Sequence, residues 1–171
     1  MQEIAATIRD IPDFPKPGIV FKDLTPVMRD GRLLRAAATA LAQPFVTERV
    51  SVVLGMEARG FIFGSLVAAE LGAGFVPLRK PGKLPWRVHQ MSYDLEYGST
   101  ALEMHQDAVG PEDRVLLVDD LIATGGTAAA SLALAARNGA TVVGAAFVVE
   151  LDFLRGRDAL GDCRVHSLVH Y

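Results

Sequence analysis

Short apolar runs alternate with longer amphipathic segments along the chain, and this alternation predicts its secondary structure. The short runs are rich in β-branched residues, which is typical of strands buried on both faces. The longer segments place apolar side chains three or four positions apart, as amphipathic helices do. Strands are predicted at 50–54, 75–78, 115–118, 141–149 and 164–169. Helices are predicted at 2–9, 32–45, 61–71 and 128–136, with a short helical segment at 151–160.

Strands separated by helices predict an α/β fold whose mainly parallel twisted sheet is flanked by helices. The 171 residues suit one domain, which at this length buries roughly 70% of the surface of the unfolded chain. No repeat or low-complexity tract divides the sequence, so we expect a single domain over 1–171. Ligands of such a sheet are expected at the carboxyl ends of its strands.

Two segments are predicted to lie outside the sheet. Three prolines within 12–18 remove backbone donors and fix φ, so this part is irregular until a brief extended piece at 19–21. The segment 79–98 is cationic and rich in turn residues, and long loops of this kind are usually functional lids or disordered. Apolar and acidic residues alternate around Tyr93 and Tyr97, which predicts a two-stranded flap with 101–104 as its second strand.

Composition and charge exclude several classes of protein. With 17 basic and 20 acidic residues the formal net charge is −3, which argues against duplex nucleic acid as the main partner. The single cysteine, Cys163, excludes an internal disulfide framework, and no His/Cys spacing indicates a structural zinc site. His166 and His170 are predicted to face solvent, because neither has a carboxylate or a second histidine at metal-binding spacing. No apolar run approaches the ~20 residues of a membrane span and no signal peptide is visible, so we expect a soluble cytoplasmic protein.

The clearest chemical signal follows the predicted strand at 115–118. Two adjacent carboxylates, Asp119 and Asp120, come directly after it, and a loop of small residues then leads into a helix. The loop residues are Ala123, Thr124, Gly125, Gly126 and Thr127. Free N–H groups and the helix dipole at such a helix start favour a phosphate. Because two acceptors lie just upstream, a phosphate that carries hydroxyls, such as a ribose 5-phosphate, fits this site. The alternative is a flexible helix start beside a solvated strand end, but adjacent carboxylates at the end of a buried strand usually bind something.

A second strand also ends in a glycine-bounded loop that opens a helix. This loop runs from Gly55 to Gly60 and contains one cation, Arg59. The same anion-binding argument applies to it, although an arginine in this position can equally be a surface residue.

These stretches resemble the motifs of a known enzyme family. The segment 115–127 is similar to the ribose-phosphate signature of type I phosphoribosyltransferases, which bind 5-phosphoribosyl 1-pyrophosphate (PRPP). The resemblance implies that Asp119 and Asp120 hold the ribose hydroxyls and that 123–127 wraps the 5′-phosphate. The segment 55–61 is similar to the pyrophosphate loop of the family. By the same resemblance, the residues expected to bind pyrophosphate are Ala58, Arg59, Lys80, Lys83 and His105.

The N-terminal part and the flap resemble one branch of this family, the adenine phosphoribosyltransferases. The segment 14–26 is similar to their base-binding hood, here about 10–27, and 79–105 is similar to their flexible flap. The resemblance implies that the backbones of Val20 and Lys22 read adenine while Phe21 packs on the base. In the flap it implies that Glu96 is the general acid/base, with Tyr93 and Tyr97 as further flap residues. Trp86 and Arg87 depart from the pattern of many relatives.

The resemblance covers roughly residues 10–155 and implies transfer of the phosphoribosyl group from PRPP to adenine, giving AMP and pyrophosphate. It also implies a homodimer and a Mg²⁺ ion that is held through PRPP or pyrophosphate, with no direct protein ligand. Two alternatives stay open. The base can be xanthine, guanine or hypoxanthine, since the PRPP signature says nothing of the acceptor. The second alternative is that the protein is a non-catalytic sensor of PRPP or nucleotides, although no basic helix-turn-helix for DNA binding is visible.

Overall fold

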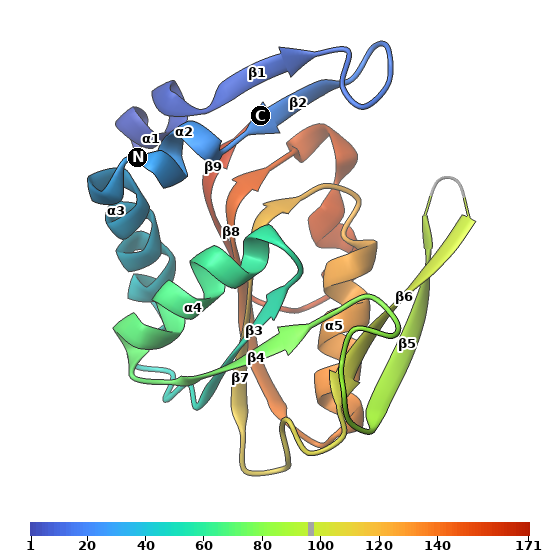
Figure 1. The fold of residues 1–171 in the computed structure, drawn as a ribbon. Helices are drawn as coiled ribbons and strands as arrows, with labels where there is room; N and C mark the ends of the chain where they lie inside the picture. Colours follow the sequence, from blue (N-terminus) through green and yellow to red (C-terminus); the bar gives the residue numbers. More distant parts are fainter. Residues whose placement is uncertain (96–97) are drawn as a thin grey trace.

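The computed structural model describes residues 1–95 and 98–171, and this part of the chain centres on a five-stranded sheet with the order β4-β3-β7-β8-β9 (Figure 1). The strands are β3 (Val52–Met56), β4 (Gly74–Leu78), β7 (Arg114–Ile122), β8 (Thr141–Glu150) and β9 (Val165–His170). Every neighbouring pair in this sheet is parallel. The expected α/β fold with a mainly parallel sheet is therefore confirmed.

Helices cover both faces of the sheet, because its central strands are apolar on both faces. In β7, Leu116 and Val118 belong to one buried cluster, while Val115 and Leu117 belong to the other. This alternation follows from the two-residue period of a strand. The helices α3 (Gly31–Ala42) and α4 (Arg59–Leu71) pack on the first face, and α5 (Gly126–Arg137) packs on the second (Figure 1).

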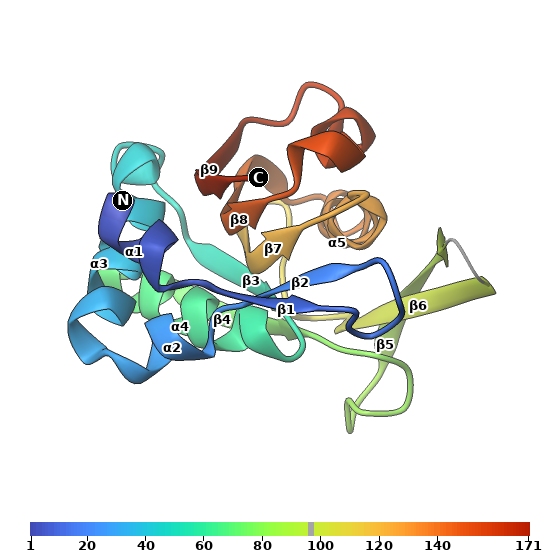
Figure 2. The same cartoon turned by 90° about the horizontal axis from the view of Figure 1, so that it is seen from above.

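Two antiparallel pairs of strands stand outside the central sheet. The hood consists of β1 (Arg9–Pro12) and β2 (Val20–Asp23), between the short helices α1 (Gln2–Thr7) and α2 (Thr25–Arg29). It lies over the carboxyl end of the sheet, as the two views in Figures 1 and 2 show. The flap consists of β5 (Val88–Leu95) and β6 (Gly98–His105), which confirms the predicted two-stranded flap. The remaining elements are the 3₁₀ turns η1 (Gln43–Phe45), η2 (Asp152–Leu154) and η3 (Gly156–Leu160).

Strand β7 is longer than predicted. The two carboxylates do not end it; they lie within it, because β8 continues to pair with β7 up to Ile122 and Glu150. On the other edge, pairing with β3 ends at Gly55 and Val118. The carboxylates therefore begin where one edge of β7 loses its neighbour, and this open edge creates room for a ligand.

The N-terminal prediction was wrong in part. Helix α1 ends at Thr7, and residues 9–12 form β1 instead of continuing the helix predicted at 2–9. The cause is tertiary, since Arg9–Pro12 pairs with a strand eight or more residues further along the chain. The segment predicted as helical at 151–160 is two 3₁₀ turns, interrupted at Arg155, whose φ is 53°. Helix α4 starts at Arg59, two residues earlier than predicted.

The strand order places a topological switch point between β3 and β7. After β3 the chain crosses to β4 through α4, on one face of the sheet, and after β7 it crosses to β8 through α5, on the other. The two loops consequently diverge and leave a crevice at the carboxyl ends of β3 and β7. Open α/β sheets bind their ligands in such crevices.

Candidate active site

A cavity of about 460 Å³ lies at this switch point. It is lined by Ala58, Arg59, Lys80 and the continuous run 119–128. The tertiary structure thus brings together most of the residues that the sequence assigned to PRPP and pyrophosphate. The cavity combines three carboxylates, including that of Glu57, with two cationic side chains and the N-terminus of a helix.

The phosphate loop gets its shape from Gly125, the residue before α5. Its φ of 81° lies in the left-handed region, which glycine adopts without strain. The first residues of α5, Gly126 to Ala128, line the cavity, so the unpaired N–H groups of its first turn lie at the cavity wall. This arrangement suits a phosphate group.

Gly156 supports the phosphate loop from behind, and sequence reasoning missed it. A Cβ atom on Gly156 would lie 2.2 Å from the carbonyl oxygen of Ala123, and one on Gly125 would lie 2.2 Å from the carbonyl oxygen of Gly156. Two backbones therefore pack with no side chain between them. Nothing in the local sequence signals this contact, since it joins segments about thirty positions apart.

The carboxylates Asp119 and Asp120 differ in their surroundings. Asp119 Oδ1 accepts the N–H of Asp120 at 2.8 Å. Burial and the adjacent charge of Asp120 raise the pKa of Asp119 well above its ordinary value. Asp120, 5% exposed, forms an ion pair with Arg59, in which its Oδ2 contacts Arg59 Nε. This buried oxygen accepts no hydrogen bond within the described part of the chain. A ligand hydroxyl that binds Asp120 Oδ2 would therefore share it with Arg59.

Gly60 allows the carboxylate of Asp119 to approach the start of α4. A Cβ atom at position 60 would lie 2.6 Å from Asp119 Oδ1 and 3.1 Å from the carbonyl oxygen of Val118. No non-bonded Cβ atom occupies such a distance without displacing its neighbour. Sequence reasoning included Gly60 in the loop but did not connect it with Asp119.

Glu57 joins the loop after β3 to the root of the flap. Its side chain is 7% exposed and accepts hydrogen bonds from Arg79 Nε (2.9 Å) and Lys83 Nζ (2.7 Å). Burial alone would raise the pKa of Glu57, but the hydrogen bonds from Lys83 and Arg79 outweigh it, and the pKa is lowered. The peptide bond between Glu57 and Ala58 is cis. Sequence reasoning gave Glu57 no role.

Two of the expected pyrophosphate residues do not line the cavity. Lys83 is paired with Glu57. His105 lies at the end of β6, where its ring centroid is 6.3 Å from that of Trp86 in an edge-to-face contact. The structure therefore places Lys80, and not Lys83 or His105, at the cavity wall.

The hood residues lie beside the cavity without lining it. The ring of Phe21 packs under the guanidinium of Arg59, with 5.2 Å between the ring centroid and Cζ. Phe14 contacts the same ring edge-to-face at 5.3 Å. Val20 is 50% exposed, and the side chain of Lys22 is 11% exposed. The hood thus touches the pyrophosphate loop through Phe21.

The flap residues Glu96 and Tyr97 lie outside the described residues. Tyr93 belongs to β5, where its backbone pairs with Thr100 of β6. The roles expected of these three residues stay predictions.

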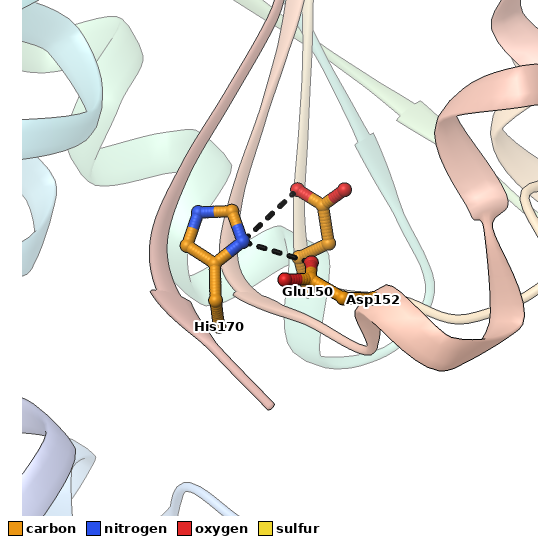
Figure 3. Close-up of side chains that lie close together, drawn as sticks. All are labelled: Glu150, Asp152 and His170. Atoms are coloured by element: carbon orange, nitrogen blue, oxygen red, sulfur yellow. Dashed lines mark hydrogen bonds and ion pairs between the residues drawn. The ribbon is translucent and has the colours of Figure 1, made fainter.

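His170 is exposed, as predicted, but the expectation that it has no carboxylate partner was wrong. His170 does have carboxylate neighbours, since its Nδ1 lies 2.9 Å from Asp152 Oδ1 and 3.9 Å from Glu150 Oε2 (Figure 3). These three residues are the one group in the described part of the chain whose atoms could surround a metal ion. However, both oxygens of Glu150 already accept hydrogen bonds from Arg157, at 2.5 and 2.7 Å. The group lies away from the cavity lining and is satisfied by its own ion pairs.

Known proteins match the chain over its whole length. The family model described as phosphoribosyl transferase domain matches residues 28–163. Adenine phosphoribosyltransferase of Methylococcus capsulatus is 63% identical over 171 residues, which is all of both chains. The enzyme of the same name from Anaeromyxobacter dehalogenans is 54% identical and matches all of this chain and 99% of its own.

Solved structures agree with this match. Adenine phosphoribosyltransferase from Rhodothermus marinus has a TM-score of 0.95 and 50% identity, with 99% of this chain and 97% of that chain covered. The enzyme from Saccharomyces cerevisiae, solved in complex with adenine and an imino-altritol bisphosphate, has a TM-score of 0.92 and 40% identity, with 98% and 97% covered. No helix in the described part of the chain has the length and apolar character needed to span a membrane.

Proposed function

This chain belongs to the phosphoribosyltransferase family, and from that premise we propose that it transfers the 5-phosphoribosyl group of PRPP to adenine. The products are AMP and pyrophosphate, so the reaction salvages a purine base. The adenine phosphoribosyltransferases that match the chain over its full length support this assignment.

The observation that carries the proposal is the cavity at the switch point. A single space of about 460 Å³ combines the N-terminus of α5 with the paired carboxylates and Arg59. The helix N-terminus suits the 5′-phosphate. The carboxylates of Asp119 and Asp120 suit the ribose hydroxyls as acceptors. A 5-phosphoribosyl group needs an anion site and two hydroxyl acceptors this close together.

Cationic groups in the same cavity suit the leaving pyrophosphate. Positive charge develops at the anomeric carbon as the bond to pyrophosphate breaks, and negative charge accumulates on the leaving group. Arg59 and Lys80 line the cavity, where preorganised cations stabilise that negative charge most strongly. Glu57 holds Lys83 close to this wall at the root of the flap.

The residues present fit a Mg²⁺ ion that binds mainly through the substrate. Mg²⁺ prefers one or two carboxylates together with phosphate oxygens and water. Three carboxylates line the cavity, but we assign Asp119 and Asp120 to the ribose hydroxyls, and Glu57 is engaged with Arg79 and Lys83. When bound, the ion would neutralise charge on pyrophosphate. We therefore propose that the ion is held through PRPP or pyrophosphate, with no direct protein ligand.

The open edge of β2 suits recognition of adenine. The hood sheet has two strands, so the outer edge of β2 has unpaired backbone groups. Val20 and Lys22 are two positions apart, and their backbone groups therefore point to the same edge. One C=O and one N–H on that edge would match the N6 donor and N1 acceptor of adenine. A 6-oxopurine would place acceptor against acceptor, and mismatches of this kind can discriminate by ~10⁴ or more.

The base must lose or share a proton when its N9 attacks the ribose. Glu96 is the residue we propose for this proton, on the resemblance of the flap sequence alone. A positioned acid/base group contributes typically ~10² to 10⁴ in rate. Glu96→Gln should lower kcat by about that factor with PRPP affinity nearly unchanged, because the phosphate contacts lie elsewhere. Single-turnover AMP formation and PRPP binding, measured separately, test this. If Glu96→Gln forms AMP at an unchanged rate, Glu96 has no role in proton transfer. Catalysis then depends on substrate positioning and on electrostatic stabilisation of the leaving group.

The function is tested by incubating the purified protein with PRPP, Mg²⁺ and one base at a time. We expect AMP and pyrophosphate from adenine, and little turnover of hypoxanthine, guanine or xanthine. Comparable turnover of a 6-oxopurine would overturn the adenine assignment. PRPP binding without turnover of any base would indicate a sensor instead of an enzyme.

We further propose that the protein acts in the cytoplasm as a homodimer. Both properties rest on the resemblance to the family, and the single cysteine agrees with a reducing compartment. Size-exclusion chromatography with light scattering would test the dimer, and a mass of one chain would refute it.

A further inference from the structure

The side chain of Lys22 is withdrawn from water although it lies in the exposed hood. It is 11% exposed, and its Nζ is 2.7 Å from Asp10 Oδ1. The same Nζ lies over the ring of Tyr171, 3.7 Å from the ring centroid. An ammonium at this distance from an aromatic face makes a cation–π contact. Lys22 is therefore held by a carboxylate within the hood and by a ring outside it.

Tyr171 is fixed to the central sheet by its backbone. Its N–H donates to the carbonyl oxygen of Glu150 at 3.0 Å, and its carbonyl oxygen accepts the N–H of Asp152 at 2.8 Å. Tyr171 directly follows β9, which pairs with β8, and Figure 1 shows this end of the chain beside the hood strands. The ring is consequently a fixed point of the main body against which the hood can rest.

A second contact holds β2 from its other face. Neighbouring residues of a strand point to opposite faces, so Phe21 and Lys22 reach different parts of the protein. Phe21 packs under Arg59 of α4, and Lys22 packs on Tyr171. In one contact the hood supplies the ring, and in the other it supplies the cation. Together the two contacts clamp β2 at the two residues nearest the expected base.

We propose that Tyr171 is a positioning residue for adenine. Its ring holds Lys22 and so fixes the position of the open edge of β2, whose backbone groups bind the base. This inference rests on the proposed function. Tyr171 does not line the cavity and acts only through Lys22. Its loss should therefore weaken adenine binding and leave PRPP binding intact. The ring face makes the contact, so the hydroxyl of Tyr171 is dispensable.

Steady-state kinetics of Tyr171→Leu and Tyr171→Phe test the inference. A partly desolvated cation–π contact corresponds to about three- to tenfold in affinity, so Tyr171→Leu should raise KM for adenine by about that factor. KM for PRPP should stay within about twofold of the unsubstituted protein. Tyr171→Phe keeps the ring and should restore the adenine KM. Phe153→Leu is the matched control, since Phe153 is a 72% exposed aromatic residue in the adjoining η2.

A double-mutant cycle shows whether Tyr171 acts through Lys22. Lys22→Met keeps the length of the side chain and removes its charge. If the contact carries the effect, Tyr171→Leu should raise the adenine KM little further in the Lys22→Met background. An unchanged adenine KM in Tyr171→Leu, an equal rise in KM for PRPP, or fully additive effects in the cycle would each overturn the inference.

Amide hydrogen exchange separates this inference from the proposed function. Exchange of the hood peptide 9–23 requires no substrate, and it should quicken in Tyr171→Leu but not in Tyr171→Phe or Phe153→Leu. If the unsubstituted protein makes no AMP, the proposed function fails, while faster hood exchange still supports the role of Tyr171 in holding β2. Unchanged hood exchange in Tyr171→Leu would refute that role whichever base is used.

Discussion

At the residue scale, Gly60 shows how a missing side chain contributes to a binding site. The space that its Cβ would occupy is taken by Asp119 Oδ1, at 2.6 Å, and by backbone at 3.1 Å. The carboxylate can therefore sit directly at the start of α4. An alanine at this position would push Asp119 away from the ribose hydroxyls that we assign to it.

We expect Gly60→Ala to weaken PRPP binding by about tenfold, the effect of one impaired charge-assisted hydrogen bond. Isothermal titration with PRPP and Mg²⁺ measures this affinity. Gly31→Ala is the control, because Gly31 also begins a helix and its Cβ would meet nothing within 4 Å. Equal PRPP affinity in both variants would show that the contact between Gly60 and Asp119 has no role in binding.

At the element scale, polar contacts fix the root of the flap to the loop that follows β3. Glu57, after β3, binds Arg79 and Lys83 at the root of the flap. Gly82, between those two residues, donates its N–H to Glu103 of β6 at 3.0 Å. The flap root is thus fixed to the pyrophosphate loop. Movement of the flap would then begin beyond these contacts, which suits a lid that excludes water from the reacting centre.

Asp23, the last residue of β2, stabilises the end of the hood that adjoins α2. Its carboxylate accepts the backbone N–H and the hydroxyl of Thr25, each at 2.9 Å, and pairs with Arg9. The Thr25 N–H, then Arg9 and the Thr25 hydroxyl, lower the pKa of Asp23 from 3.8 to about 2. A lowered pKa contributes stability above the unfolded value of 3.8, and this contribution is lost as the pH falls toward 2.

Asp23→Asn should therefore destabilise the protein at pH 7 by about 1 kcal/mol, a value reduced for the nearness of solvent. The difference from the unsubstituted protein should shrink as the pH falls below 3.8 toward about 2, because Asp23 then becomes protonated and loses its charge. Urea unfolding at a series of pH values measures it. The exposed Asp162, replaced by asparagine, is the control. A difference independent of pH would mean that the charge of Asp23 is not what stabilises the hood.

At the scale of the whole molecule, the strand order decides where the site lies. The order β4-β3-β7-β8-β9 brings the loops after β3 and β7 together, although sixty positions separate them in sequence. Because PRPP would contact both loops, it should bind the folded chain and not the unfolded one. Binding of this kind raises the stability of the whole domain by mass action.

PRPP with Mg²⁺ at about 100 times its Kd should stabilise the protein by about 2.7 kcal/mol, which is about 5 to 10 °C in Tm for a domain of this size. Differential scanning calorimetry measures the shift. Asp120→Asn removes the charge of a carboxylate that lines the cavity and that we assign to a ribose hydroxyl, so its shift at the same PRPP concentration should be clearly smaller. Equal shifts in both proteins would place the ribose away from Asp120.

The sequence by itself determined the features that depend on local geometry. Alternation of apolar residues predicted the five strands of the parallel sheet, because the two faces of a buried strand are read within a few positions. The order strand, carboxylates, small residues and helix predicted the phosphate loop at 123–127 for the same reason. Repetition of this pattern after β3 made Arg59 a candidate, and the family resemblance favoured it over a surface residue.

Only the tertiary structure decided which distant side chains meet. It paired Arg59 with Asp120, Glu57 with Lys83, and Lys22 with Tyr171. The carboxylate neighbours of His170 were missed for this reason, since Glu150 is adjacent through the pairing of β8 with β9 and not through sequence spacing. Strand β1 was missed because its partner, and not its own pattern, makes it a strand. The physical reason is that periodicity reports the conformation of one segment, whereas strand order and packing determine which segments come into contact.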